Sequence, residues 1–548
     1  MSKFIFVTGG VVSSLGKGIV AASIGNILQN EGFSIKIKKL DPYLNIDPGT
    51  MNPIEHGEVF ITGDGGETDL DLGHYERFTN IQASKNDNIT SGKIYQNLIQ
   101  KERKGDYIGK TVQVVPHVTD LIKEFILYDS EKYDFVICEI GGTVGDIEGQ
   151  PFLEAIRQLR YELKNDTLSV HLTLLPYISA SDEIKTKPTQ HSIKELMSYG
   201  INADILICRT SVPLDYANKK KLSAFCNILP DNLIEAPDVK NIYSLPIVYA
   251  ENGLDKAILK HFNLDQNKEL YNKNIQIWKD FIYKMDNLQD VVKIAIVGKY
   301  TVSKDSYKSL IEALQHACIQ NNLKADIQLI DSNKINNQKT AKELLNNFQC
   351  IVIPGGFGST GIDGKIEAIR YSRENDIPFL GICFGMQLSI IEFCRNVCNM
   401  KNATSRELIN QNEKQEDYEC VVDIMNQWIK DDAFENRTNE ANLGGTMRLG
   451  NYRAKIKNPS LAYKIYQSEN IIERHRHRYE VNIKYRSIIE QNNGLFSGLS
   501  QDEQLPEIFE IKDHKFFIAV QFHPEFLSKP LKPHPIFTNL IKSTIEND

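Results

Sequence analysis

Residues 9–19 read GGVVSSLGKGI and follow the apolar run FIFVT at 4–8. The segment almost matches the phosphate-binding loop G-x-x-x-x-G-K-[ST]. It differs from this pattern at two points. Five residues, not four, separate Gly10 from Gly16, and Gly18 stands where Ser or Thr normally follows the lysine. Lys17 at the start of a helix would bring an ammonium group, backbone N–H donors and the helix dipole to one anion. A plain glycine turn is the alternative interpretation.

Outward from this loop, β-rich runs alternate with helical patterns. A helix is expected at 19–32, and strands are expected at 34–42, 134–142, 171–177 and 204–210. Strands separated by helices predict parallel βαβ units and a doubly wound sheet.

A second α/β pattern begins at residue 291 with VVKIAIVGKY and continues through 350–358, 378–393 and 516–526. The polar stretch between the two patterns indicates a linker that carries a helix. We therefore expect an α/β protein with two doubly wound, mostly parallel-sheet domains. The predicted division is 1–267 for the first domain, 268–290 for the linker helix and 291–548 for the second domain.

The bulk composition excludes several classes of protein. The 548-residue chain has a formal net charge of −8, whereas nucleic-acid binding needs a basic surface. The longest apolar runs fall short of the roughly 18 residues that a membrane span needs. Nine scattered cysteines without zinc-ribbon spacing fit free thiols in a reducing cytosol. We expect a cytoplasmic protein that binds neither nucleic acid nor membrane.

Three short motifs in the second half indicate acyl-transfer chemistry. GICFG (381–385) has the form of a nucleophile elbow, which would raise Cys383 to a helix N-terminus. QFHPE (521–525) supplies His523 as a base, with Glu525 on the same side of an extended segment to orient it. PGGFG (354–358) would offer backbone N–H groups as an oxyanion hole. The alternative for Cys383 is an ordinary buried cysteine. Together the three motifs resemble the class I, triad-type glutamine amidotransferases.

Acidic and basic loops in the first half indicate a phosphate and metal site. ETDLDLGHYERF (67–78) and CEIGGTVGDIE (138–148) place several carboxylates on loops and at a strand end, where hard oxygen ligands suit Mg²⁺. EIKTKPTQHS (183–192) is predicted to be a stiff basic loop able to meet a triphosphate and a base edge. Solvated surface charge is the alternative for these segments.

These stretches, taken in order, resemble the CTP synthase family. The resemblance is carried by FVTGGVVSSLGKGI, KLDPYLNIDPGTMNPIEHGEVF, ETDLDLGHYERF, GDYIGKTVQV, EIGGTVGDIE, KTKPTQHS, LGGTMRLG and ERHRHRYEVN, and it runs from residue 4 to about 540. It implies a ligase that makes CTP from UTP, ATP and L-glutamine with Mg²⁺. In this family ATP phosphorylates O4 of the uracil ring, ammonia from glutamine replaces the phosphate, GTP activates, CTP inhibits, and the N-terminal domain forms homotetramers. Filament assembly is left open.

The resemblance also implies roles for individual residues. The expected glutaminase triad is Cys383, His523 and Glu525, and Mg²⁺ is expected at Asp71 and Glu139. The expected ATP contacts are Ser14, Leu15, Gly16, Lys17, Gly18, Ile19, Lys39, Asp71, Asp238 and Val239. The expected UTP and CTP contacts are Ser13, Asp146, Ile147, Glu148, Lys185, Thr186, Lys187, Pro188, Thr189, Gln190 and Lys221. The expected glutamine contacts are Gly356, Phe384, Gly385, Met386, Gln387, Glu407 and Arg474.

Further implications concern regulation and ammonia transfer. Pro53, His56 and Val59 match the gate of an ammonia tunnel, although His56 alone also fits an ordinary loop histidine. LGGTMRLG (443–450) resembles the lid engaged by GTP. Near the adenine contacts this chain has Pro237 where the family usually has Lys.

Two rival hypotheses remain at this point. One is a related phosphate-loop amidotransferase that amidates a carboxylate, as cobyric-acid-type synthases do. The KTKPTQHS and GTMNPIEHGEVF segments disfavour it. The other is a non-catalytic relative that senses nucleotides or forms filaments, which the retained Cys383, His523, Glu525 and Lys17 disfavour. The RHRHR run at 474–478 has the composition of a nucleic-acid patch, but the acidic chain and its flanking glutamates argue against that function.

Overall fold

The computed structural model describes residues 2–299, 303–356, 358, 360–409, 415–424, 427–430, 433–436 and 447–545. The chain forms two compact units. Unit 1 comprises Met1–Thr50 and Thr68–Tyr283, and unit 2 comprises Met51–Glu67 and Lys284–Asp548. A segment from the N-terminal half therefore belongs to unit 2, so no single cut in the sequence separates the units. The domain boundaries predicted at 267 and 291 stay a prediction.

Unit 1 is built on a seven-stranded sheet in which every pairing is parallel. Its strand order is β11 (Leu233–Pro237), β10 (Ile205–Thr210), β7 (Thr167–Leu174), β1 (Lys3–Gly9), β6 (Phe135–Ile140), β2 (Ile35–Asp41) and β5 (Asn88–Thr90). The order reverses direction on either side of β1. Loops that follow the central strands therefore gather at one edge of the sheet, where doubly wound folds bind their ligands.

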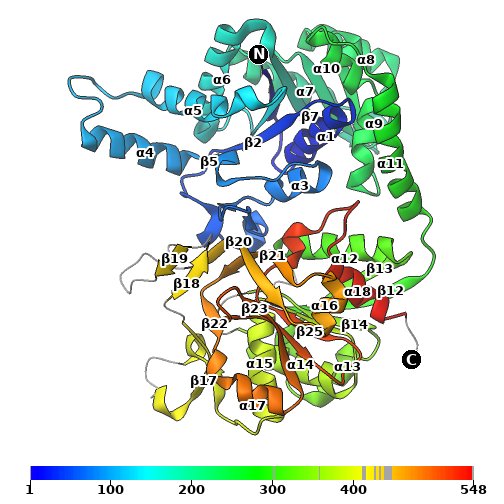
Figure 1. Cartoon of the computed structure of the whole chain (residues 1–548). Helices are drawn as coiled ribbons and strands as arrows, with labels where there is room; N and C mark the ends of the chain where they lie inside the picture. Colours follow the sequence, from blue (N-terminus) through cyan, green and yellow to red (C-terminus); the bar gives the residue numbers. More distant parts are fainter. Residues whose placement is uncertain are drawn as a thin grey trace. The chain divides into compact units, whose positions relative to one another are not determined.

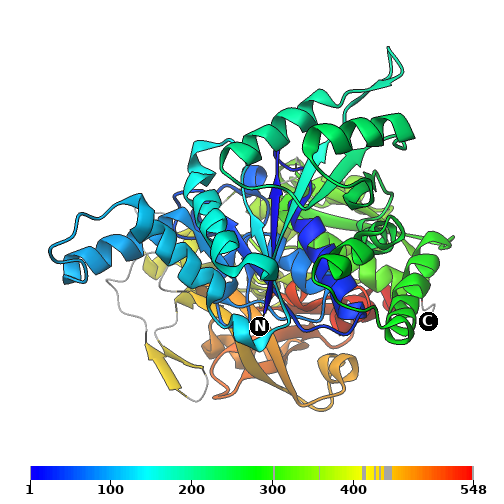
Figure 2. The same cartoon turned by 90° about the horizontal axis from the view of Figure 1, so that it is seen from above.

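Helices cover both faces of this sheet (Figures 1 and 2). On one face, α1 (Lys17–Asn30) packs against β1, β2 and β6, with α3 (Asp71–Phe78) and α9 (Leu245–Glu251) beside it. The other face carries α4 (Ser91–Lys104), α5 (Thr119–Leu127), α6 (Gln150–Leu163), α7 (Lys187–Ser198) and α8 (Tyr216–Cys226), whose apolar side chains form one buried core with Phe4, Phe6, Val136 and Cys138.

Unit 2 is built on a nine-stranded sheet. Five parallel strands come first in its order, namely β13 (Lys324–Asp331), β12 (Val291–Gly298), β14 (Cys350–Ile353), β15 (Phe379–Ile382) and β25 (Phe517–Val520). Four antiparallel strands extend it, namely β24 (Pro506–Ile511), β23 (Gly494–Ser500), β20 (Arg448–Ile456) and β21 (Asn470–His477). The predicted α/β class with mostly parallel sheets is confirmed, with this antiparallel extension added.

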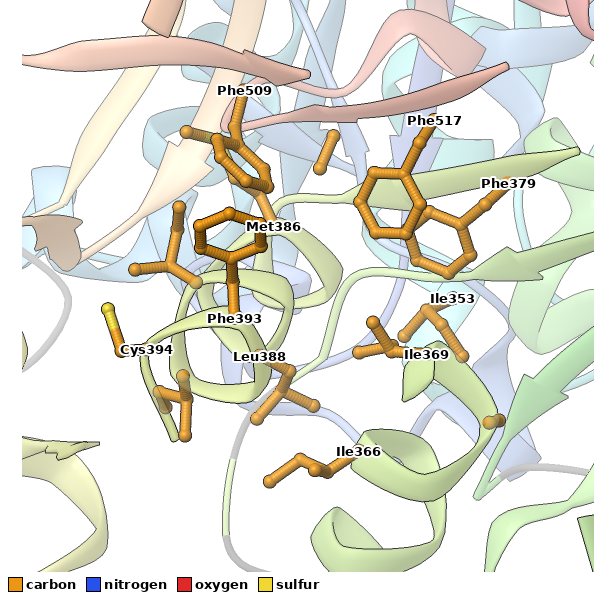
Figure 3. Close-up of a cluster of buried hydrophobic side chains, with 14 of the residues drawn as sticks. Ile353, Ile366, Ile369, Phe379, Met386, Leu388, Phe393, Cys394, Phe509 and Phe517 are labelled. Atoms are coloured by element: carbon orange, nitrogen blue, oxygen red, sulfur yellow. The ribbon is translucent and has the colours of Figure 1, made fainter. Parts of the chain in front are cut away.

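The core beside β15 fixes the helix that follows the predicted nucleophile. Phe379 and Phe517 stack with ring centroids 4.4 Å apart, and α15 (Phe384–Asn396) lays Met386, Leu388 and Phe393 into the same cluster (Figure 3). α14 (Ile362–Glu374) closes the cluster from the other side. A close-packed apolar base of this kind holds the β15–α15 turn in one conformation.

The expected linker helix is α11 (Lys268–Asp286). Its Trp278 is buried, donates a hydrogen bond to the carbonyl oxygen of Tyr243 at 2.6 Å and packs its ring near that of Phe78. Most of this helix therefore packs as part of unit 1. No helix among the described residues is both long enough and apolar enough to cross a bilayer.

Candidate active sites

The glycine loop is the first candidate site, and it lies between β1 and α1. Gly16 adopts φ 104°, a left-handed conformation that glycine tolerates best, and α1 begins at Lys17. The Lys17 ammonium group donates to the carbonyl oxygen of Gly142 at 2.5 Å, and its stem lies against Gly9. Burial lowers the pKa of Lys17. The loop thus brings a partly desolvated cation to a helix N-terminus, an arrangement suited to phosphate.

Gly18 departs from the usual phosphate-loop pattern because Asp71 occupies the space of its side chain. A Cβ on Gly18 would lie 2.0 Å from Oδ1 of Asp71. Asp71 is the first residue of α3, not a loop residue as predicted, and α3 packs on α1. A Ser or Thr at position 18 would therefore displace this carboxylate.

Lys39, at the end of β2, is the centre of a buried cluster of carboxylates. Its Nζ lies 2.5 Å from Asp71, 2.9 Å from Glu139 and 3.6 Å from Asp41. Burial opposes the charge, but these carboxylates raise the pKa of Lys39 well above its usual value. Tyr75 donates a hydrogen bond to the second oxygen of Glu139. The predicted ATP residues Lys17, Lys39 and Asp71 and the predicted metal ligand Glu139 therefore converge on one site.

The cluster holds more carboxyl groups than lysines. Four carboxyl groups, those of Asp41, Asp69, Asp71 and Glu139, interact with Lys17 and Lys39, and His74 also acts on Asp71. Burial, together with neighbouring carboxylates, raises the pKa of Asp69 well above its usual value and also raises that of Glu139. Among the described residues, no group of three or more His, Cys, Asp or Glu is arranged to hold a metal by itself.

The segment predicted as a basic loop is largely helical. α7 begins at Lys187 with Pro188 in its first turn, so the loop prediction is wrong from that residue onward. Proline is favoured in a first helical turn because its missing N–H would be unpaired there anyway. Thr189 is buried and donates to the carbonyl oxygen of Leu174, and Gln190 donates to the hydroxyl of Thr186. Of the other predicted UTP and CTP residues, Ser13, Asp146 and Lys185 lie on loops, Ile147 and Glu148 lie in a short 3-10 helix, and Lys221 lies on α8.

A buried hydrogen-bonded chain connects β1 to α7, and sequence reasoning missed it. His171 on β7 lies 2.9 Å from the Thr8 hydroxyl through Nδ1 and 2.7 Å from the Ser192 hydroxyl through Nε2. Burial, helped by the charge of Lys17, lowers the pKa of His171 to about 3. This neutral imidazole therefore ties the strand before the glycine loop to the helix that carries Thr189. The apolar run around His171 gave no signal of it.

A pocket of about 280 Å³ lies beside the glycine loop in unit 1. Arg209 lines it, with its guanidinium 3.2 Å from Asp238 and 3.2 Å from the carbonyl oxygen of Leu15. Arg209 was not singled out from sequence, because a lone arginine at a strand end carries no motif. The lining also includes Val12, Ser14, Leu174, Leu175, Pro176, Tyr177, Thr210 and Ser211. The predicted adenine residue Asp238 thus lies at this pocket, and Val239 follows it after the end of β11.

Cys383 occupies a strained turn between β15 and α15. Its φ of 53° with ψ of −102° is unusual for a residue with a side chain, and α15 begins at Phe384. Glycines permit this turn, since a Cβ on Gly385 would lie 2.3 Å from the carbonyl oxygen of Ile353. The nucleophile-elbow prediction agrees with this geometry.

His523 and Glu525 make the contact expected of a base and its orienting acid. His523 Nδ1 lies 2.7 Å from Oε1 of Glu525. The predicted extended arrangement is wrong, because β25 ends at Val520 and Pro524 begins a short 3-10 helix over Pro524–Leu527. Burial opposes the charge, yet Glu525 and then Cys383 raise the pKa of His523 to about 10. The geometry therefore favours an imidazolium beside the Cys383 sulfur.

Backbone and amide groups complete the surroundings of Cys383. Gln521 directs its side-chain amide to Sγ at 3.8 Å, a contact that sequence reasoning did not foresee. Gln387 donates to the carbonyl oxygen of Tyr479 at 2.8 Å. Gly355 is required beside the base, because a Cβ there would lie 2.7 Å from Cε1 of His523. Of the remaining predicted glutamine residues, Glu407 accepts a hydrogen bond from the N–H of Gly358 at 3.1 Å. Phe384, Gly385 and Met386 form the first turn of α15.

Strand β21 gives the RHRHR run its structural meaning. Successive side chains of the strand point to opposite faces of the sheet. Its histidines face a buried network in which Arg448 binds Glu480 at 3.0 Å and Glu507 at 2.9 Å. Its arginines face the other way. The predicted glutamine residue Arg474 directs its guanidinium to the carbonyl oxygen of Ile61 at 3.0 Å. Residues 443–446 of the predicted lid lie outside the described residues, and Arg448 begins β20.

Comparisons with known proteins match both halves of the chain. A family model described as CTP synthase N-terminus matches residues 3–264, and one described as Glutamine amidotransferase class-I matches residues 302–543. The chain is 55% identical to a CTP synthase of Pelagibacter ubique over 99% of both chains, and 53% identical to one of Bartonella bacilliformis over all of this chain and 99% of that one. A solved structure, "Trypanosoma brucei CTPS - glutaminase domain with bound acivicin", is 34% identical, covers 47% of this chain and 95% of its own, and has a TM-score of 0.41.

Full-length identity above 50% to curated relatives, with both domain models matched in order, leaves one assignment. The chain belongs to the CTP synthase family of glutamine-hydrolysing ligases.

Proposed function

We propose that this enzyme aminates C4 of UTP to give CTP by way of a 4-phosphorylated intermediate, with ammonia released from glutamine. The observation that carries the proposal is the pair of sites in one chain. Unit 1 gathers Lys17, Lys39 and a surplus of carboxylates, and unit 2 holds Cys383 beside a His–Glu pair. One set suits phosphoryl transfer and the other suits amide hydrolysis.

In unit 1, residues 14–19 would wrap the ATP phosphates, with Lys17 as the cation. Lys39 would neutralise charge on the transferring phosphoryl group, which is the main demand that this chemistry makes on a protein. The phosphoryl group passes from ATP to O4 of the uracil, and ammonia then attacks C4 and expels phosphate. Asp238 and Arg209 flank a pocket of about 280 Å³, which supports an adenine site there. Asp238 and Val239 stay the proposed contacts.

Asp71 and Glu139 would hold Mg²⁺ together with phosphate oxygens of the nucleotide. Magnesium usually takes only one or two carboxylates from the protein in such sites. The convergence of Asp71 and Glu139 on Lys39, at 2.5 Å and 2.9 Å, supports this assignment. When bound, the ion supplies charge neutralisation at the phosphates.

The uridine nucleotide would bind at the N-terminal turn of α7 and the loops around it. Ser13, residues 185–190 and Lys221 are the proposed contacts for UTP. Residues 146–148 would contact the cytosine of the inhibitor CTP. The buried hydrogen bond of Thr189 supports a fixed position for this turn.

In unit 2, the Cys383 thiolate attacks the side-chain amide carbon of glutamine. The oxyanion that forms would accept N–H donors from the turn after Cys383 and from the loop of Gly355 and Gly356. The His523 imidazolium then gives its proton to the leaving nitrogen, so that ammonia departs and a glutamyl thioester remains. The neutral imidazole next takes a proton from water, which attacks the thioester and releases glutamate. Gln387, Glu407 and Arg474 are among the proposed contacts for glutamine.

Ammonia would reach unit 1 through a closed passage gated by Pro53, His56 and Val59, since free ammonia is protonated in neutral water. GTP would activate the glutaminase through residues 443–450. A cytoplasmic homotetramer is proposed through the N-terminal half. In unit 1, α4 exposes Ile99, and the connection from α4 to α5 exposes Ile108, Val114 and Val115; these exposed apolar side chains support an assembly there.

The decisive experiment measures CTP formation from UTP, ATP and Mg²⁺, with either glutamine plus GTP or ammonium chloride as nitrogen source. We expect CTP in both reactions. CTP from ammonium alone would contradict the glutaminase and transfer part of the proposal. A folded protein that binds ATP but makes CTP from neither source would contradict the assigned substrate.

A further inference from the structure

We infer that the hairpin of residues 60–67, although it comes from the N-terminal half of the sequence, is a positioning element of the Cys383–His523–Glu525 triad. The hairpin consists of β3 (Phe60–Ile61), a turn and the start of β4 (Glu67–Thr68). The inference rests on the proposed glutaminase function of that triad and adds residues to which no role in it has been assigned.

The hairpin is held by the outward arginines of β21. Arg474 is 1% exposed and donates to the carbonyl oxygen of Ile61 at 3.0 Å, with its guanidinium 5.4 Å from the centroid of the Phe60 ring. Arg476 binds the Glu67 carboxylate through Nε at 2.9 Å and through Nη2 at 2.8 Å. A charged pair held by two N–H groups fixes geometry as well as adding attraction.

The backbone of these same two arginines contacts the triad. The carbonyl oxygen of Arg474 accepts the N–H of His523 at 2.7 Å, and that of Arg476 lies 3.7 Å from Sγ of Cys383. β21 therefore lies between the hairpin and the nucleophile–base pair. A shift of the arginine side chains would move the carbonyl groups that fix His523 and border Cys383.

A second route runs through aromatic rings. Phe60 meets Phe526 edge to face with centroids 5.2 Å apart, and Phe526 stacks on His523 at 5.3 Å and 22°. Phe60 is 1% exposed. Such contacts restrict how far an imidazole can tilt, and a displacement of about 1 Å in a catalytic group can cost a hundredfold in rate.

The hairpin cannot drift away from unit 2, because it is anchored on either side. Its turn packs on β20, where the N–H of Asn451 donates to the carbonyl oxygen of Gly63 at 2.8 Å. Gly450 has φ 88°, and a Cβ there would lie 2.5 Å from the backbone nitrogen of Gly65. Before the hairpin, Glu58 accepts the N–H of Ser309 at 2.9 Å in the first turn of α12 (Lys308–Gln320).

The test uses full-length Phe60→Leu and Glu67→Gln proteins. Two readouts are taken: glutaminase kcat and KM, and the pH dependence of Cys383 alkylation by iodoacetamide. We expect kcat to fall about tenfold to a hundredfold because the base is misplaced. The change in KM should be smaller for Glu67→Gln, because its partner Arg476 is not a proposed glutamine contact. The upper limb of the alkylation profile should move to lower pH, because a displaced His523 lies less closely against Glu525 and Cys383, which raise its pKa. CTP synthesis from ammonium should stay within about twofold of the parent.

Phe496→Leu is the matched control, because Phe496 is equally buried in unit 2 but packs against Phe509, away from the triad. Loss of kcat in the control equal to that in Phe60→Leu would overturn the inference, as would unchanged kcat and an unchanged alkylation profile in both hairpin variants. Failure of the proposed function is distinguishable, because the parent enzyme itself would then lack glutaminase activity. The alkylation profile would still decide whether the hairpin positions His523.

Discussion

Gly18 and Asp71 exclude any side chain between them: a Cβ on Gly18 would lie 2.0 Å from Oδ1 of Asp71. The contact places the carboxylate that binds Lys39 directly against the first turn of α1. It explains why Gly18, rather than Ser or Thr, follows Lys17 in this glycine loop. The contact also predicts that Gly18→Ala is harmful to activity, whereas helix propensity predicts that the same change stabilises the helix.

Gly18→Ala is expected to lower CTP synthesis about a hundredfold with glutamine and with ammonium alike, because the methyl group displaces Asp71. Helix propensity alone predicts stabilisation of about 1 kcal/mol for the same change. The assay compares both nitrogen sources in parallel with glutaminase activity, which should persist. Gly149→Ala is the control, since nothing lies within 4 Å of a Cβ built there. Normal synthesis by Gly18→Ala would refute the role of the contact.

Lys17→Met is expected to abolish CTP synthesis from either nitrogen source while Cys383 stays reactive towards iodoacetamide. The substitution keeps the apolar stem that packs on Gly9 and removes the ammonium group. ATP affinity and synthesis are measured together with the alkylation rate. Lys132→Met removes an exposed lysine of the same unit and should leave all three unchanged. Surviving synthesis in Lys17→Met would exclude a phosphate role.

Glu525→Gln is expected to lower the pKa of His523 from about 10 towards the ordinary value of about 6.5, because it removes the main charge that favours the imidazolium. Glutaminase kcat should fall by about 10²–10⁴-fold. The imidazole titration can be followed by NMR alongside the activity. Glu503→Gln serves as the control, since Glu503 pairs with Lys455 at the surface of the same unit. An unchanged His523 titration would contradict the pairing.

His171→Gln is expected to reduce the fall in the unfolding free energy of unit 1 at acid pH. The pKa of His171 is depressed to about 3 in the folded protein, so unfolding takes up a proton below pH 6.5. The stability from keeping it neutral is fully present above pH 6.5 and is lost as the pH falls towards 3. The loss is about 2 kcal/mol at pH 5.

Denaturation of the parent and of His171→Gln at pH 7.5 and pH 5 tests this. The variant is expected to be less stable at pH 7.5, because Thr8 and Ser192 lose a partner. The difference in unfolding free energy between pH 7.5 and pH 5 should nevertheless be smaller in the variant than in the parent. Equal pH dependence in the two proteins would show that His171 does not titrate as described.

The features that the sequence predicts well are local. β1, the glycine loop and α1 follow one another within thirty residues, and GICFG and QFHPE each place their functional side chains within a few positions. Strand–turn–helix geometry is determined by glycine and apolar spacing, so these elements were predictable. The turn at Pro524 was not, because a strand pattern conceals where the strand ends.

The remaining features depend on contacts between distant residues. Nothing near Gly18 in the sequence reports that Asp71 packs on it. In the RHRHR run, Arg476 pairs with Glu67 on one side of β21 and His475 lies near Glu507 on the other, and the sequence alone does not show either partner. Likewise, Thr8, His171 and Ser192 are separated by more than 20 residues at each step. Single side chains that meet across a fold leave no periodic signal.

The assignment of residues 51–67 to unit 2 bears on any attempt to divide this enzyme. A gene cut near residue 290 would not yield two complete halves. The carboxy-terminal product would carry Cys383, His523 and Glu525 yet leave Arg474, Arg476 and Phe526 without the chain that covers them. Supplying residues 51–67 as a separate peptide, or grafting them through a new connection, would be needed to rebuild that part in isolation.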